Sequence, residues 1–290
     1  MKSGFVSVVG RPNVGKSTLV NALVGSKVSI ISSRPQTTRN TIRGVLHRGD
    51  AQIVFVDTPG LHRPRTALGE RLNRLVYGSL EDADAVVFVL DATQPIGPGD
   101  RLIAGRLAES GTDVVVVVNK TDAAGKDDVA AMLGEAGEWD FAAYVPVSAL
   151  QGTGLGPLLD EVLPRLPEGP AYFPPGMTTD QPDELLMAEI VREKFLDRLR
   201  EELPHSLAVV VGDVETRDDG TLYIPARLVV ERDSQKGIVI GQKGSVLAAA
   251  GTEAREELER LFGTRVFLDM KVVVEKDWQR RESLLDRLGF

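Results

Sequence analysis

The residues best suited to chemistry in this 290-residue chain form a glycine-rich loop near its start. The loop has the pattern Gly-x-x-x-x-Gly-Lys-Ser, follows an apolar segment typical of a strand, and precedes a helix-like one. Its glycines allow successive backbone N–H groups to surround phosphates, while the lysine reaches the outer phosphates and the serine hydroxyl ligates magnesium. The residues that we expect to contact the nucleotide here are Gly10, Arg11, Pro12, Asn13, Val14, Gly15, Lys16, Ser17 and Thr18.

A second motif, Asn-Lys-Thr-Asp at residues 119–122, indicates which base is bound. A carboxylate only accepts hydrogen bonds, so Asp122 can take both the ring N–H and the 2-amino group of guanine, whereas adenine offers neither donor in that geometry. After the next strand-like segment, backbone N–H groups of a Ser-Ala pair can face the base oxygen. The sequence therefore predicts GTP and GDP, not ATP, as ligands. The residues expected at the nucleoside are Asn119, Lys120, Asp122, Ser148 and Ala149.

Two further segments supply groups for magnesium and the γ-phosphate. Asp57, Thr58, Pro59 and Gly60 end an apolar strand, where the carboxylate can hold magnesium through a water and the Gly60 N–H can meet the γ-phosphate. In the polar stretch 26–40, a threonine is expected to close on magnesium and the γ-phosphate in the GTP state and to release them after hydrolysis. We expect the catalytic groups to be Lys16, Thr38, Asp57 and Gly60, and the magnesium ligands to be Ser17, Thr38 and Asp57.

Leu61 occupies the position where Ras-like proteins have the glutamine that orients the attacking water. A leucine side chain cannot orient water, because it has no polar atom. We therefore expect slow intrinsic hydrolysis, or a water positioned by backbone groups, another side chain, a cation or a partner. Asn13 resembles the asparagine with which potassium-stimulated GTPases hold a monovalent cation, which makes K⁺ a candidate cofactor.

The pattern of apolar segments predicts an α/β fold for the first part of the chain. Apolar, β-branched runs at 5–9, 53–56, 85–90, 114–118 and 144–147 are separated by segments with helical spacing or capping signals. This alternation predicts a mostly parallel sheet, with the motifs at the carboxyl ends of its strands. Residues 40–48 and 51–56 instead predict a hairpin, since Gly49 and Asp50 lie between them.

The second part of the chain predicts a smaller α+β domain. Prolines crowd between residues 167 and 182, so we expect a GTPase domain at 1–168, a linker at 169–182 and a second domain at 183–290. An amphipathic helix at 183–203, strands at 207–216 and 222–232, a helix at 245–262 and a strand at 266–274 are predicted there.

A Gly-x-x-Gly sequence between the hairpin and the following helix indicates RNA binding. In K-homology domains this loop allows close approach to the sugar-phosphate strand, and a neighbouring apolar groove accepts about four unpaired bases. The same four residues could alone form a simple helix-entry turn, but the order of the surrounding elements favours a type II K-homology domain. The RNA-binding residues expected are Lys236, Ile240, Gly241, Gln242, Lys243 and Gly244.

Composition restricts the remaining classes of function. The chain has no cysteine, which excludes disulfides, thiol nucleophiles and thiolate metal sites and suits a reducing cytoplasm. Its net charge of −8 argues against indiscriminate nucleic-acid binding, so RNA contacts must be local. The longest apolar runs are far shorter than the roughly 20 residues that span a bilayer, and we expect a cytoplasmic protein.

Together these motifs resemble the Era family of bacterial GTPases, within the TrmE–Era–Der group. The resemblance rests on the nucleotide motifs, on residues 35–39, on the sequence from Asp57 to His62, and on residues 240–244 and 251–255. It implies binding to the 3′ end of 16S ribosomal RNA, assembly of the small ribosomal subunit, and peripheral association with the inner membrane face. We expect a monomer. Two alternatives are a GTPase of the same group acting on tRNA, and an RNA-binding scaffold that stores GDP with little catalysis.

One departure from the family concerns the helix after Gly-x-x-Gly. Family members usually carry a lysine early in this helix, whereas residues 245–250 contain none. We therefore expect one phosphate contact fewer, and a difference in RNA affinity or site preference.

Overall fold

The computed structural model describes residues 1–32, 34, 37–61, 64 and 66–290. The chain divides into two compact units, which we describe separately. The first comprises Met1–Ser29, Thr38–Pro64 and Gly69–Asp180, and the second comprises residues 181–290 with two short segments from within 30–37 and 65–68. No described helix combines the length and apolar character needed to cross a bilayer.

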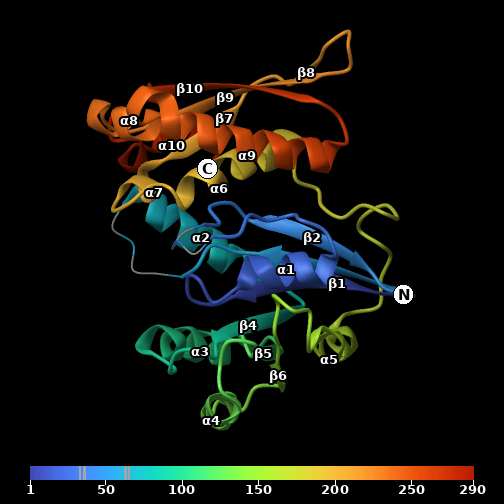
Figure 1. The fold of residues 1–290 in the computed structure, drawn as a ribbon. Coiled ribbons are helices and arrows are strands. Elements are labelled where there is room, and N and C mark those ends of the chain that lie inside the picture. Colours follow the sequence, from blue (N-terminus) through green and yellow to red (C-terminus); the bar gives the residue numbers. More distant parts are fainter. Residues whose placement is uncertain (33, 35–36, 62–63, 65) are drawn as a thin grey trace. The chain divides into compact units, whose positions relative to one another are not determined.

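The first unit contains a six-stranded sheet with the order β2-β3-β1-β4-β5-β6 (Figure 1). Every neighbouring pair is parallel except β2 and β3, which form the predicted hairpin. The mostly parallel sheet is thus confirmed. The strands are β1 (Lys2–Val9), β2 (Ile42–His47), β3 (Ala51–Asp57), β4 (Ala85–Asp91), β5 (Val114–Asn119) and β6 (Ala143–Pro146). The helices are α1 (Lys16–Val24), α2 (Ala67–Glu81), α3 (Pro98–Ser110), α4 (Lys126–Gly137) and α5 (Leu155–Val162), followed by the 3₁₀ turn η1 (Leu163–Arg165).

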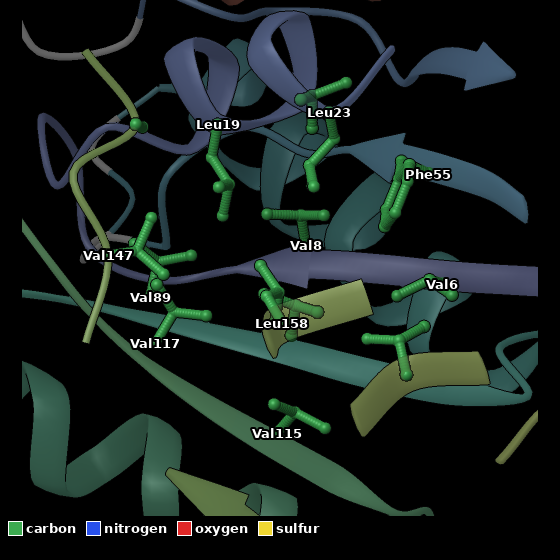
Figure 2. Packing of buried hydrophobic residues seen from close by; sticks show 14 of the residues in the cluster. Val6, Val8, Leu19, Leu23, Phe55, Val89, Val115, Val117, Val147 and Leu158 are labelled. Atoms are coloured by element: carbon green, nitrogen blue, oxygen red, sulfur yellow. The ribbon is translucent and has the colours of Figure 1, made fainter. Parts of the chain in front are cut away.

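The central strands are buried on both faces, which explains their continuous apolar runs. Because side chains alternate along a strand, Val87 and Val89 of β4 enter the core under α1 and α5, whereas Val86 and Phe88 enter the core under α3 and α4. Figure 2 shows the first of these cores, where Leu19 of α1 and other apolar side chains pack over the sheet. This packing fixes the strands so that their carboxyl ends meet at one edge.

The proline-rich segment is bound along the first unit. Val45 donates a backbone hydrogen bond of 2.8 Å to Thr178, and the Gln52 amide bonds the backbone of Tyr172 and Phe173. Residues up to Asp180 therefore belong to this compact unit. The division into a domain at 1–168, a linker at 169–182 and a domain at 183–290 stays a prediction.

The second unit carries the sheet β10-β9-β7, with β8 paired to β9. Strand β10 runs parallel to β9, while β7 and β8 are antiparallel to it. Helices α6 and α9 cover one face through a core that includes Ile190, Phe195, Leu228 and Leu258. The elements are α6 (Asp183–Leu196), α7 (Leu203–Ser206), β7 (Ala208–Val211), β8 (Glu215–Thr216), β9 (Leu222–Val230), α8 (Asp233–Ile240), η2 (Gln242–Gly244), α9 (Ser245–Phe262), β10 (Val266–Val274), η3 (Trp278–Arg280) and α10 (Glu282–Arg287).

Three elements of this unit differ from the sequence prediction. The helix predicted at 183–203 ends at Leu196, and the strand predicted at 207–216 is divided into β7 and β8. The division has a clear cause: Gly212 donates to Pro225 of β9, but Pro225 has no N–H to return a bond. Residues 233–240 form a helix, α8, whose start is stabilised because Gln235 accepts the backbone N–H groups of Glu231 and Arg232.

Candidate nucleotide site and RNA-binding loop

The glycines of the phosphate loop hold conformations and contacts that exclude a side chain. Gly10 has φ 153°, and a Cβ there would lie 2.5 Å from the carbonyl oxygen of Val89. Gly15 has φ 97°, and a Cβ would lie 2.3 Å from Nδ2 of Asn119. A Cβ on Gly60 would lie 2.7 Å from the nitrogen of the loop proline. The phosphate loop is therefore packed directly against β4, β5 and the segment that follows β3.

The Lys16 ammonium is buried within this loop. Its Nζ donates to the carbonyl oxygens of Gly10 at 3.2 Å and Arg11 at 3.0 Å. Burial lowers the pKa of Lys16 to about 8, although the nearby Asp57 carboxylate acts in the opposite direction. A negatively charged polyphosphate beside the lysine would favour the protonated form, because an opposite charge stabilises an ammonium.

The three predicted magnesium ligands lie together. The hydroxyls of Ser17 and Thr38 are 2.9 Å apart, and Thr38 Oγ1 lies 3.5 Å from Asp57 Oδ2. Asp57 Oδ2 also accepts a 2.6 Å hydrogen bond from Ser29, a residue that no sequence motif indicated. Burial raises the pKa of Asp57 despite that bond. Asp57 Oδ1 is buried without a hydrogen-bond partner in the described part of the chain.

This donor set fits magnesium. Mg²⁺ prefers hard oxygen ligands, and one or two carboxylates usually complete its binding together with phosphate oxygens. Two hydroxyls and a buried carboxylate oxygen that lacks a partner among the described residues provide such ligands. No cluster of three or more His, Cys, Asp or Glu side chains suited to a metal occurs within residues 1–32, 34, 37–61, 64 and 66–290.

The base-reading motif is tied to the phosphate loop. Asn119 Nδ2 donates to the Val14 carbonyl at 2.9 Å, and its Oδ1 accepts the Ala149 N–H at 3.0 Å. Ser148 donates a 2.5 Å hydrogen bond to Asp122 Oδ1. The predicted Asn119, Asp122, Ser148 and Ala149 are thus neighbours, and Asn119 connects the segments that would face the phosphates and the base.

Lys120 adds a second connection. Its Nζ donates to the Asn13 carbonyl at 2.7 Å and to Asp91 Oδ2 at 2.6 Å. Asp91 ends β4 and was not identified from the sequence. The sequence did contain an indication of this role, because Asp91 comes directly after the apolar run 85–90, and so lies at the same edge of the sheet as the other motifs. Lys120 therefore stabilises the phosphate loop from the side of the base.

Leu61 faces an apolar environment. Its side chain packs on the core that includes Phe88 and Ile103, and it lines a hollow of about 240 Å³ with Tyr77 and Leu107. The segment after β3 thus offers hydrophobic surface at the position where Ras-like proteins have their water-orienting glutamine. Three further residues predicted for the nucleotide site are also described. Thr18 lies in α1, Thr58 donates a hydrogen bond from its hydroxyl to the Val8 carbonyl, and Pro59 directly precedes Gly60.

The Gly-x-x-Gly loop joins α8 to α9. Gly241 has φ 76°, and a Cβ would lie 2.5 Å from Val246 Cγ2. Gly244 has φ 80° and precedes the first residue of α9, where a Cβ would meet open space. Gln242 and Lys243 are exposed between them, while Ile240 ends α8. Lys236 lies one helical turn earlier in α8. The predicted RNA-binding residues therefore form one continuous surface segment.

Comparison with known proteins agrees with both parts of the chain. The family model described as "50S ribosome-binding GTPase" matches residues 5–120, and the "KH domain" model matches residues 202–279. GTPase Era of Mycobacterium avium is 52% identical over 100% of this chain and 99% of its own length. GTPase Era of Mycobacterium tuberculosis H37Rv is 52% identical over 99% and 98%.

Two solved structures match the complete fold. One is Era in complex with MgGDPNP and nucleotides 1506–1542 of 16S ribosomal RNA, and the other is a point variant of Aquifex aeolicus Era bound to GDP·AlF4⁻. Each is 41% identical to this chain, with a TM-score of 0.96, and the match covers 100% of this chain and 99% of that one. The predicted combination of a P-loop GTPase domain and a K-homology domain is confirmed.

Proposed function

The chain belongs to the Era family of GTPases, and we propose that it is a GTP-hydrolysing switch that binds the 3′ end of 16S ribosomal RNA during assembly of the small ribosomal subunit. The main support for nucleotide binding is the position of Asn119, which is hydrogen bonded to both the Val14 carbonyl and the Ala149 N–H. That geometry brings the phosphate loop and the base-reading segment to one edge of the sheet. The RNA part rests on the K-homology match and on the related Era structure that contains this RNA.

Each predicted residue receives a role from its position. Lys16 neutralises the outer phosphates, and Asp122 accepts the guanine N–H and amino donors. Ser17, Thr38 and Asp57 would hold magnesium, which would neutralise negative charge on the phosphate oxygens. The Gly60 N–H lies beside the loop, since a Cβ on Gly60 would contact Pro12, and it donates to the γ-phosphate. Release of Thr38 after hydrolysis is the switch.

Hydrolysis is expected to be slow without a stimulating factor. Leu61 packs in an apolar environment and has no atom that can orient water. Asn13 lies in the phosphate loop with φ 66°, and its proposed role is to hold a monovalent cation beside the phosphates. A comparison of GTP turnover in K⁺ and in Na⁺ tests this role, and equal rates would remove it.

In the second unit, the Gly-x-x-Gly loop presents backbone and Lys243 to the RNA strand. Gly241 and Gly244 both have positive φ, which favours glycine, and the lack of side chains at these positions suits close contact with a sugar-phosphate chain. Lys236, Ile240 and Gln242 complete the contact surface. We assign the protein to the cytoplasm as a monomer, and peripheral membrane association stays an expectation of the family resemblance.

The decisive experiment measures two activities of the whole chain. GTP should bind far more tightly than ATP in a competition assay with Mg²⁺, and an RNA with the sequence of 16S nucleotides 1506–1542 should bind and increase phosphate release. Equal binding of the two nucleotides would contradict the GTPase assignment. RNA binding without phosphate release would favour the alternative of a GDP-storing scaffold, which the apolar setting of Leu61 makes worth testing. Preferential binding of tRNA would instead favour the tRNA-directed alternative.

A further inference from the structure

A second corner of the K-homology unit combines exposed aromatic rings with arginines. Phe267 of β10 is 49% exposed, and its ring stacks on that of Tyr223 in β9 with centroids 5.9 Å apart. The Arg217 guanidinium lies over both rings, 4.6 Å from the Phe267 centroid and 4.9 Å from that of Tyr223. Exposed stacks of aromatic and guanidinium planes are surfaces on which unpaired bases stack.

The turn between β8 and β9 fixes Arg217 in this position. Arg217 donates a 2.9 Å backbone hydrogen bond to Thr221, and Asp219 accepts the Thr221 N–H at 3.0 Å. Thr264, from the segment before β10, donates to the Gly220 carbonyl at 2.8 Å. The stack is therefore held by a bonded turn and by two paired strands, so little ordering is required when a ligand binds.

A hollow of about 740 Å³ lies beside the stack. Phe267, Arg255 and Arg265 line it together with Glu259. Glu259 is paired with Arg255 at 2.9 Å, and its pKa is lowered by the Val266 N–H, by Arg255 and by the nearby Arg265 guanidinium. Arg217 thus lies over the aromatic pair, and Arg255 and Arg265 line the adjoining hollow, while Asp269 accepts the Tyr223 hydroxyl. The guanidinium groups of Arg217 and Arg265 suit phosphate groups that flank a stacked base.

This corner is separate from the Gly-x-x-Gly loop. The loop precedes Ser245, the first residue of α9, whereas the hollow is lined by Arg255 in the second half of this 18-residue helix and by Gly263, which directly follows it. At 1.5 Å per residue, the helix separates its first residue from Arg255 by about 15 Å and from Gly263 by about 27 Å. Figure 1 shows α8 at one end of this unit and the β8 hairpin at the other. A stacked strand rising about 3.4 Å per nucleotide needs roughly four to eight nucleotides to cover this separation.

We infer that Arg217, Tyr223, Arg255, Arg265 and Phe267 form a second RNA-binding site, which takes an unpaired base and its flanking phosphates from the same RNA that occupies the Gly-x-x-Gly loop. The inference rests on the proposed RNA-binding function and extends it. A longer RNA gains affinity by engaging both sites, because the second contact becomes intramolecular once the first has formed. A fragment that fills only the loop cannot reach the corner.

The test compares two RNAs with the full-length protein. One has the sequence of nucleotides 1506–1542 of 16S ribosomal RNA, and the other is a single strand of about six nucleotides from its 3′ end, enough for the four-base groove. Binding is measured by fluorescence anisotropy. Phe267→Ala and Arg265→Glu are each expected to weaken binding of the longer RNA about tenfold and to leave the short RNA unaffected. Phe267→Trp should bind the longer RNA like the unmodified protein, since it keeps a stacking surface.

Two control variants separate a local effect at this corner from a general change in charge or a loss of the loop. Arg260→Glu makes the same change of charge as Arg265→Glu. Because Arg260 is exposed on α9 and does not line the hollow, this variant should bind both RNAs normally. Gly241→Asp should weaken binding of both RNAs. Unchanged affinity of Phe267→Ala for the longer RNA overturns the inference, as does an equal loss in Arg260→Glu or a loss of the short RNA in Phe267→Ala. If the unmodified protein binds neither RNA, the proposed RNA-binding function itself fails.

Discussion

The phosphate loop and the Gly-x-x-Gly loop both depend on glycines with positive φ, but their surroundings differ. Side chains at Gly10 and Gly15 would meet residues of β4 and β5 that lie far away in the sequence. A side chain at Gly241 would meet only Val246 of the adjoining helix, and one at Gly244 would meet nothing within 4 Å. The nucleotide site therefore requires the assembled sheet, whereas the RNA-binding loop is shaped mainly by its own helix–turn–helix. This difference predicts that the two sites can be removed independently.

The largest effect is expected from Lys16→Ala. Removal of the ammonium leaves the triphosphate without its closest positive charge in a buried setting, and we expect GTP affinity to fall at least about a hundredfold. Calorimetry with Mg·GTP measures this change. Lys271→Ala, which removes an exposed lysine of the other unit, serves as the control. Retained affinity in Lys16→Ala would contradict the assignment of the phosphate loop, and RNA binding should be the same in both variants.

Asp122→Asn should change which base is bound. The amide can donate to the oxygen that xanthine carries at the 2-position, so we expect a loss of GTP affinity by about a hundredfold and a gain for xanthosine triphosphate. Ser148→Ala removes only the hydroxyl that orients the carboxylate and should cost about fivefold in GTP affinity. Competition binding with the two nucleotides separates these outcomes. An unchanged preference for guanine in Asp122→Asn would argue strongly against its role in base recognition.

The converse experiment removes the RNA site alone. Gly241→Asp introduces a side chain where a Cβ would lie 2.5 Å from Val246 and adds a negative charge beside the RNA strand, so we expect RNA affinity to fall at least about tenfold. Intrinsic GTP hydrolysis should remain unchanged. Gly237→Ala is the matched control, because a Cβ there meets no atom within 4 Å and its φ is not positive. Normal RNA affinity of Gly241→Asp would refute the assignment of the loop.

The smallest effect concerns pH and Ser29. Burial raises the pKa of Asp57, and the Ser29 hydroxyl lowers it by stabilising the carboxylate. Protons compete with Mg²⁺ for this carboxylate, so Mg²⁺ affinity should decrease as the pH falls through that pKa. In Ser29→Ala the pKa should be higher still, so the decrease should begin at a higher pH, with a loss of a few fold in Mg²⁺ affinity at a given pH within that range. Titrations of Mg²⁺ into the GDP complex at several pH values test this, and superimposable profiles for the two proteins would contradict it.

Much of the fold followed from local patterns. The buried strands, the hairpin at β2 and β3, and helix α9 were predicted because apolar periodicity and turn residues reflect short-range backbone geometry. Helix α8 was not predicted, since its apolar residues 238–240 resemble a strand in isolation. The division of β7 from β8 was not predicted either, because it depends on Pro225, which lies on the neighbouring strand.

The sequence by itself determined the residues proposed for the chemistry of this protein: a lysine and glycines for phosphate, oxygen ligands for magnesium, a carboxylate for guanine, and a glycine loop for RNA. Only the tertiary structure decided which groups support them. Ser29 lies 28 residues from Asp57, and Asp91 lies 29 residues from Lys120, yet each pair is hydrogen bonded. The physical reason is that residue types and spacing specify local conformation and bonding capacity, whereas partners across such separations depend on how the strands align and pack.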